Sequence, residues 1–211
     1  MTEFSFSCLG VRPDPCAAAP TLVFRLRITA STGVRVHALA LRCGLRIEPA
    51  RRGYDAEEAA ALGDLLGERS RWGGLDPVRI AQVSAMVPGF AGGIETDLAV
   101  PCTYDTDVVA SRYFRSLNGG DVPLLLRFSG TAFTGAAGVA VEPVDWEEEI
   151  SHAMPVKTWH EMIDQHFPGC GWLRLPGDAM DALLAYRTRN ALPSWEATVE
   201  RLLDGAGEGA H

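Results

Sequence analysis

The stretch TLVFRLRITA, residues 21–30, decides the fold class of this chain. Its large apolar side chains occupy every second position and belong to Leu22, Phe24, Leu26 and Ile28. A period of two predicts a β-strand with one buried face. The residues that alternate with them, and that we expect on the other face, are Val23, Arg25, Arg27 and Thr29.

A second alternating run, residues 38–47, follows the turn signal of residues 31–33. Its apolar positions are Leu39, Leu41, Cys43, Leu45 and Ile47. Two strands joined by a turn share one core only if the turn holds an even number of residues, because a shift of one residue moves every side chain to the other face. A two-residue loop, Thr32-Gly33, meets this condition. We therefore expect a β-hairpin that places Leu26 opposite Leu39 and Phe24 opposite Leu41.

Further strands are predicted at residues 78–87, 94–104, 122–133 and 139–144, of which the last two form another hairpin through the turn at 135–138. Helical spacing appears in two places between these strands. One helix is predicted at residues 55–67, where Gly67 ends it, and one at residues 107–117, capped by Asp105 or Thr106.

The last third of the chain changes to helical periodicity. One helix begins at Pro155, a second at Asp178, and a third is capped by Ser194. The side chains that we expect inside are Trp159, Ile163 and Phe167, then Met180, Leu183 and Leu184, then Trp195, Val199, Leu202 and Leu203. The whole pattern predicts an α+β fold.

The α+β interpretation has three parts. Residues 1–150 form a mainly antiparallel β-sheet or sandwich with the two inserted helices. Residues 151–205 form a helical region that packs on it as one structural unit, and residues 206–211 form a flexible tail.

Charge and composition narrow the possible partners. The chain has 211 residues, 19 of them basic and 27 acidic, for a net charge of −8. Such a surface repels nucleic acid and anionic lipid, so the expected partner is another protein or a small molecule. The chain contains neither an apolar run of about 20 residues nor a basic start followed by an apolar stretch. The five cysteines are an odd, scattered set, typical of reduced and buried thiols. We expect a cytoplasmic protein.

Linear motifs for a metal, a cofactor or catalysis are absent. No CxxC pair occurs, and His160 and His166 lie about 240° apart on a helix, so they face different sides. His37 shares the apolar side of its strand with Cys43, but about 20 Å separates them. We expect His37 to be hydrogen-bonded at the edge of the core. No GxSxG elbow or phosphate-binding glycine pattern is present, and the sequence predicts no catalytic residues, no metal and no cofactor.

Arginines make the most distinctive surface feature. Arg25, Arg27, Arg42 and Arg46 point away from the predicted core, and the run Arg51-Arg52-Gly53-Tyr54 follows directly. Stacked on one sheet face, these side chains can bind a carboxylate or an acidic helix of a partner. Alternatively, they pair with the chain's own acidic residues. Trp172, in a loop between Gly171 and Leu173, is a second candidate anchor for a partner.

Four segments together resemble an uncharacterised bacterial family of unknown function. They are ALALRCGLRIEPARRGY (residues 38–54), VPCTYD (100–105), VPLLLRFSGTAF (122–133) and LPSWEATVERLL (192–203). Members of that family are often encoded beside uptake NiFe-hydrogenase and maturation genes. The resemblance implies no catalytic residues, and it implies a partner among hydrogenase subunits or maturation factors. The early hairpin is also similar to the SecB type of export chaperone.

Three hypotheses follow. The first is a non-enzymatic protein-interaction or assembly factor, accessory to hydrogenase assembly. The second is an enzyme or a small-molecule or metal carrier whose site is assembled from distant residues such as His37, Cys102 and Asp105. The third is a SecB-like chaperone with an apolar groove.

Overall fold

The computed structural model describes residues 2–31, 33–102, 110, 112–135, 138–169 and 175–208. Two compact units are present, Met1–Cys170 and Gly171–His211. Among the described residues, no helix combines the length and apolarity needed to cross a lipid bilayer.

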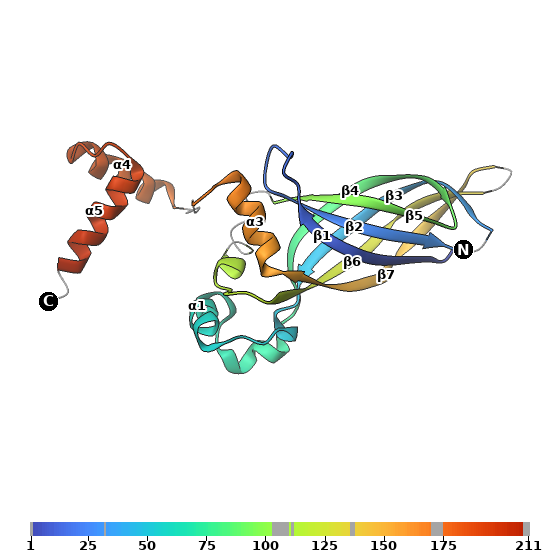
Figure 1. Ribbon diagram of the computed structural model, residues 1–211, viewed down its shortest axis with the longest axis horizontal. Coiled ribbons are helices and arrows are strands. Elements are labelled where there is room, and N and C mark those ends of the chain that lie inside the picture. Colours follow the sequence, from blue (N-terminus) through green and yellow to red (C-terminus); the bar gives the residue numbers. More distant parts are fainter. Residues whose placement is uncertain are drawn as a thin grey trace. The chain divides into compact units, whose positions relative to one another are not determined.

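The first unit is a sandwich of two antiparallel sheets that pack face to face (Figure 1). A three-stranded sheet has the order β1 (Phe4–Pro13), β2 (Thr21–Ala30), β5 (Gly93–Pro101). A four-stranded sheet has the order β4 (Val78–Ala91), β3 (Arg35–Ile47), β6 (Asp121–Thr134), β7 (Ala140–Pro155). Antiparallel sheets with inserted and C-terminal helices confirm the predicted α+β class.

The core lies between the sheets and is built from alternating residues of their strands. Phe24, Leu26 and Ile28 of β2 are 0% exposed, as are Leu124, Leu126 and Phe128 of β6. Each such side chain stabilises the fold by roughly 1.5–3 kcal/mol relative to an exposed one. The ring of Phe6 in β1 stacks on Phe128 at a centroid distance of 4.4 Å, which ties the two sheets together. Strand β1 was not among the predicted strands, although Phe4 and Phe6 alternate with serines.

The predicted hairpin between β2 and β3 is wrong. These strands lie in different sheets, and the connection through Gly33, at a φ of +83°, crosses from one sheet to the other. Leu26 pairs with Cys8 and Thr96 instead of with Leu39. An even number of residues in the turn determines only which face of each strand is buried. Two strands satisfy it equally well when they face each other across a core.

The expected position of His37 is also wrong. The register of β3 against β6 shifts between Val36 and Ala38, so Val36 enters the core and is 1% exposed. His37 is exposed, with its Nε2 atom 3.0 Å from the carbonyl oxygen of Gly135. The β-bulge reverses the alternation at one residue, which periodicity alone does not reveal.

Most of the other predicted elements are present. Helix α1 (Ala56–Leu66) ends at Gly67, whose φ is +75°. Two 3-10 helices, η1 (Pro49–Arg51) and η2 (Arg69–Gly74), flank it. The β6–β7 hairpin has the predicted order, and β4 covers the run predicted at 78–87. Strand β5 covers residues 94–101 of the run predicted at 94–104; residue 102 is not in a strand, and residues 103 and 104 lie outside the described residues. Of the helix predicted at residues 107–117, residues 110 and 112–115 are helical, whereas 107–109 and 111 lie outside the described residues.

Helix α3 (Val156–His166) completes the first unit and packs on β1, β2 and β7. Its Trp159 is 1% exposed and stacks on Phe114 at a centroid distance of 4.4 Å. The predicted boundary at residue 150 falls inside β7, because the strand continues to Pro155 opposite Asp121 of β6.

The second unit contains α4 (Gly177–Arg189) and α5 (Trp195–Glu208). Ser194 caps α5 as predicted, because its Oγ accepts a hydrogen bond from the backbone N–H of Ala197 at 3.2 Å. Within this unit alone, the apolar stripes of α4 and α5 are not covered. The exposed side chains are Met180, Leu184, Trp195, Val199, Leu202 and Leu203. Two short helices offer each other too little surface to cover them. The packing of this region on the sandwich stays a prediction.

Candidate functional site

The arginines predicted to share one face are divided between the two sheets. Arg25 and Arg27 lie on β2 in the three-stranded sheet, whereas Arg42 and Arg46 lie on β3 in the four-stranded sheet. The outer faces of a sandwich point in opposite directions. The prediction of a single arginine-bearing face is therefore wrong, for the same reason that the β2–β3 hairpin is wrong.

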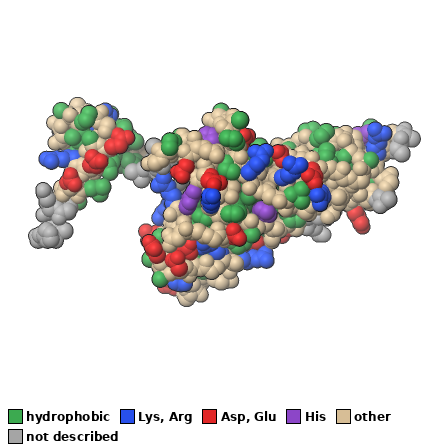
Figure 2. Space-filling model, in the orientation of Figure 1, with side chains coloured by type: hydrophobic (Ala, Val, Ile, Leu, Met, Phe, Trp, Pro, Cys, Tyr) green, Lys and Arg blue, Asp and Glu red, His purple; other side chains and the backbone are tan. Residues whose placement is uncertain are grey.

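On the three-stranded sheet, the arginines are neutralised within the chain. Nη2 of Arg27 lies 2.7 Å from Oε1 of Glu95 on β5, and Nη2 of Arg25 lies 3.0 Å from Oε2 of the same carboxylate. Hydrogen bonds from Arg27 and Arg25 hold the pKa of Glu95 below its usual range. Arg12 pairs with Asp97 at 2.9 Å. Figure 2 shows basic and acidic side chains intermingled over these strands. Internal pairing accounts for this face.

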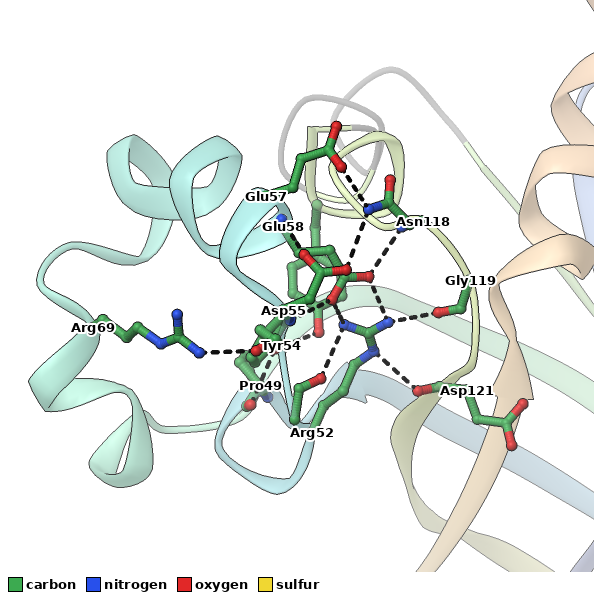
Figure 3. A network of polar contacts seen from close by, with 12 residues as sticks. Pro49, Arg52, Tyr54, Asp55, Glu57, Glu58, Arg69, Asn118, Gly119 and Asp121 are labelled. Carbon is green, nitrogen blue, oxygen red and sulfur yellow. Dashed lines mark hydrogen bonds and ion pairs between the residues drawn. The ribbon is translucent and has the colours of Figure 1, made fainter.

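Arg52 lies in a buried polar network beyond the end of β3. Its side chain is 8% exposed and that of its partner Glu58 is 5% exposed. Two of its nitrogens bind the Glu58 carboxylate, at 2.8 and 2.9 Å. The carbonyl oxygens of Gly119, Asp121 and Gly53 accept its remaining hydrogen bonds, at 2.6, 3.2 and 3.3 Å. Figure 3 shows the guanidinium enclosed by these groups. All five donors are used, so none is available to a ligand.

Glu58 is saturated in the same way. Its carboxylate accepts hydrogen bonds from the backbone N–H groups of Asn118 and Asp55, at 3.0 and 3.3 Å. Asp55 in turn accepts one from the N–H of Glu58 at 2.8 Å, which completes a capping box at the start of α1. The bonds to Arg52 dominate and lower the pKa of Glu58. The network joins α1, the end of β3 and the turn before β6, and we interpret it as structural.

Tyr54 and Arg51 are also engaged internally. The Tyr54 hydroxyl donates to the carbonyl of Pro49 at 3.0 Å and lies 2.7 Å from the Tyr113 hydroxyl. Burial raises the pKa of both phenols. Nη1 of Arg51 binds Glu48 at 3.1 Å and the hydroxyl of Ser151 at 3.1 Å. The capping-box spacing of Asp55 and Glu58 is visible in the sequence and was a missed signal. Nothing in the sequence indicates the contact between Asn118 and Glu58.

Arg42 and Arg46 differ from the other predicted arginines. Arg42 is exposed and Arg46 half-buried on the outer face of the four-stranded sheet. Within the part of the chain that the structure describes, neither guanidinium forms a hydrogen bond or an ion pair. Arg46 pairs in register with Arg79 of β4, which adds positive charge. We name this surface, defined by Arg42, Gly44 and Arg46, the Arg42 face.

The Arg42 face contains an open depression of about 560 Å³. Arg42 lies in register between Ser84 of β4 and Ser129 of β6. The other side chains that line the depression include Ala40, Met86, Thr131, Pro143 and Val144. One guanidinium beside several hydroxyl groups is an arrangement suited to an anion, and it lacks a nucleophile with an adjacent base.

His37 and Cys102, two of the distant residues proposed for a metal or catalytic site, do not come together. Cys102 lies near the start of β2, because its backbone N–H donates a hydrogen bond to the carbonyl oxygen of Pro20. His37 comes after the other end of this strand, which is ten residues long. The two are therefore about 30 Å apart. Asp105 and Trp172 lie outside the described residues. Among the residues that the structure describes, no group of three or more His, Cys, Asp or Glu side chains is placed to hold a metal ion. Cys8, Cys16 and Cys43 are free thiols.

Fold and surface together define a two-sheet β-sandwich with one self-neutralised face and one face that keeps unpaired arginines. The chain belongs to a family of unknown function, DUF6084, whose match covers residues 1–211. The resemblance seen in the sequence is thus confirmed at the level of a family of unknown function. No curated protein sequence matches the chain.

Two solved structures show a distant likeness to the chain. One is the solution structure of a late embryogenesis abundant (LEA)-type protein, with 11% identity, 75% of each chain covered and a TM-score of 0.32. Another is β-glucosidase 3B from Thermotoga neapolitana with α-D-glucose, with 11% identity, 72% of this chain and 17% of that chain covered, and a TM-score of 0.27. Similarity this low carries no functional argument.

Proposed function

We propose that this protein is a non-enzymatic interaction factor that binds an acidic partner protein through the Arg42 face. The observation that carries the proposal is the contrast between the two sheets. Arg25 and Arg27 are neutralised by Glu95, whereas Arg42 and Arg46 find no partner among the residues that the structure describes, on a protein with a net charge of −8.

Arginine on a strand suits this role for a physical reason. The planar guanidinium binds a carboxylate through two parallel hydrogen bonds, and it is more weakly hydrated than a lysine ammonium. Charge-assisted hydrogen bonds of this kind are roughly twice as strong as neutral ones. A sheet also fixes the spacing between successive outward residues, so the two arginines form a pre-organised pair.

We further propose that the partner is a hydrogenase subunit or a maturation factor, and that the protein acts in hydrogenase assembly. The support is the sequence resemblance to a family encoded beside uptake NiFe-hydrogenase genes. Gene neighbourhood is an associational argument, so the partner has to be identified directly.

The test is affinity purification of the tagged full-length protein from its native host, with partners identified by mass spectrometry. R42Q/R46Q removes the charges of the Arg42 face, and R25Q/R27Q is the matched control with the same residue types on the opposite sheet. Wild type and control should recover a stoichiometric hydrogenase subunit or maturation factor, and R42Q/R46Q should lose it. Equal recovery by both variants, or no stoichiometric partner of the folded wild type, would overturn the proposal.

A chaperone-like activity is the second candidate, and one observation favours it. The exposed apolar side chains of α4 and α5, among them Met180, Leu184 and Val199, are the kind of surface that a chaperone presents to unfolded chains. This hypothesis predicts tetramers in light scattering and suppression of aggregation of an unfolded substrate. A monomer without such suppression would remove it.

A further inference from the structure

We infer that the Arg42 face receives an extended acidic segment of the partner, with carboxylates four residues apart seated on Arg42 and Arg46. This inference rests on the proposed function and adds the conformation and the sequence spacing of what is bound. It follows from three features: the distance between the arginines, the open space between them, and the hydroxyl groups beside Arg42.

The distance between the arginines selects an extended chain. Arg42 and Arg46 lie four residues apart on β3, about 13 Å at the usual rise of a strand. An extended ligand above β3 has the same rise, and residues four apart point to the same side of it. Two acidic residues in positions i and i+4 therefore match both arginines at once.

A helical ligand fits this spacing poorly. A helix rises about 1.5 Å per residue, so about nine residues span the same distance. Nine residues correspond to about 900° of rotation, which places the two carboxylates on opposite sides of the helix. Residues seven apart share a side but span only about 10.5 Å. The geometry thus favours an extended segment over an acidic helix.

The space between the arginines is open enough for a backbone. Gly44 lies midway between them, and a Cβ atom placed on it would meet no atom within 4 Å. Gly44 pairs in register with Gln82 of β4 on one side and with Arg127 of β6 on the other. Arg127 forms an ion pair with Glu149 of β7. That carboxylate is neutralised by Arg127 and leaves the arginines of β3 to the ligand.

The neighbours of Arg42 suit a carboxylate. Ser84 and Ser129 flank it in register, and Thr131 lies one row further along β6. Ser129 is 4% exposed and, in the described part of the structure, makes no side-chain hydrogen bond. A carboxylate bound to the guanidinium can accept a hydrogen bond from such a hydroxyl group. The two arginine positions are therefore not equivalent, and we expect Arg42 to contribute more.

The experiment uses the full-length protein labelled with ¹⁵N and synthetic uncharged Ser/Thr/Gly peptides that carry two glutamates. One peptide has the glutamates at i and i+4, and its control has the same composition with i and i+3 spacing, which places them on opposite sides of an extended chain. Titration is followed by the side-chain Nε–H signals of Arg42 and Arg46. We expect the i,i+4 peptide to bind about tenfold more tightly, as the loss of one of two charge-assisted contacts implies.

Two glycine variants separate the geometry from the charge. Gly44→Val adds a branched side chain between the arginines. Its Cβ atom would meet no atom within 4 Å, and valine favours strands, so the variant should fold and should lose the peptide. Gly10→Val on β1, where a Cβ also meets nothing within 4 Å, is the matched control and should bind like wild type.

Three outcomes would overturn the inference: equal affinity for both spacings, unchanged binding by Gly44→Val, or an equal response to sodium acetate at the same carboxylate concentration. Each leaves the proposed function intact if R42Q/R46Q still loses the partner in the native purification. If the partner is recovered by R42Q/R46Q, the proposed function itself fails.

Discussion

Replacing Arg52 by methionine should destabilise the first unit more than any change to a surface arginine. Methionine keeps an unbranched apolar side chain but removes all five hydrogen-bond donors. The Glu58 carboxylate, whose side chain is 5% exposed, would then be left buried without a counter-charge. The carbonyl groups of Gly119 and Asp121 would lose their donors as well.

The magnitude follows from the burial of the pair. Removing one partner of a buried ion pair costs about 3–5 kcal/mol, because the other charge stays uncompensated. At a urea m-value of about 2 kcal/mol/M, this lowers the unfolding midpoint by roughly 1.5–2.5 M. The assay is urea unfolding followed by tryptophan fluorescence, since Trp72 contacts Tyr54 at the edge of the network, at a centroid distance of 5.0 Å.

Two further variants make the experiment decisive. R27M removes an exposed arginine that shares Glu95 with Arg25, and should cost at most about 1 kcal/mol. R52M/E58Q removes the uncompensated charge and keeps a residue that can form the capping box, so it should be more stable than R52M. A loss for R52M no larger than for R27M, or a double variant less stable than R52M, would refute a structural ion pair at this position.

Three other predictions concern acid, close packing and thiol reactivity. Because the folded pKa of Glu58 is lowered, its contribution to stability is complete above the ordinary glutamate pKa of about 4.3 and is lost as the pH falls further. A pH series of urea midpoints should therefore fall more steeply in acid for wild type than for E58Q, which keeps only the contributions of other carboxylates such as Glu95. Gly130→Ala should lower the free energy of unfolding by about 1–3 kcal/mol, since the new Cβ atom would lie 2.1 Å from a backbone oxygen of β3. Gly44→Ala is the control, because its Cβ atom would meet no atom within 4 Å and should cause no such loss. Equal urea midpoints for the two variants would contradict this reasoning. Burial raises the pKa of Cys43 to about 12, so a thiol reagent should modify exposed Cys16 in the folded protein and Cys43 only on unfolding.

The buried faces of the strands were predictable from the sequence, whereas their partners were not. The alternating pattern identified the inward residues of β2, β3 and β6, because the face of a strand that packs on the core must be apolar whichever sheet contains the strand. The same alternation is compatible with pairing at an edge and with packing across a core. The decision depends on non-local contacts such as that of Phe6 with Phe128, which leave no periodic trace.

The candidate site was predictable only in part. Outward-pointing arginines followed from strand parity, and both Arg42 and Arg46 do face outwards. Whether an arginine is neutralised depends on the residue opposite it, and Glu95 stands opposite Arg27 only because β5 pairs with β2. The sequence therefore indicated a set of candidates, and the strand order separated the paired from the unpaired members.

The crossing of the chain between the two sheets also has a consequence for folding kinetics. Strands β2 and β3 follow each other in the chain but belong to opposite sheets, as do β4 and β5, and β3 pairs with β6 over separations as long as Val36 to Thr134. Neither sheet can form from a continuous piece of chain. During folding, long loops must close before these contacts can stabilise the sheets. We therefore expect slow, cooperative folding in milliseconds to seconds. We also expect no stable fragment that contains one sheet alone.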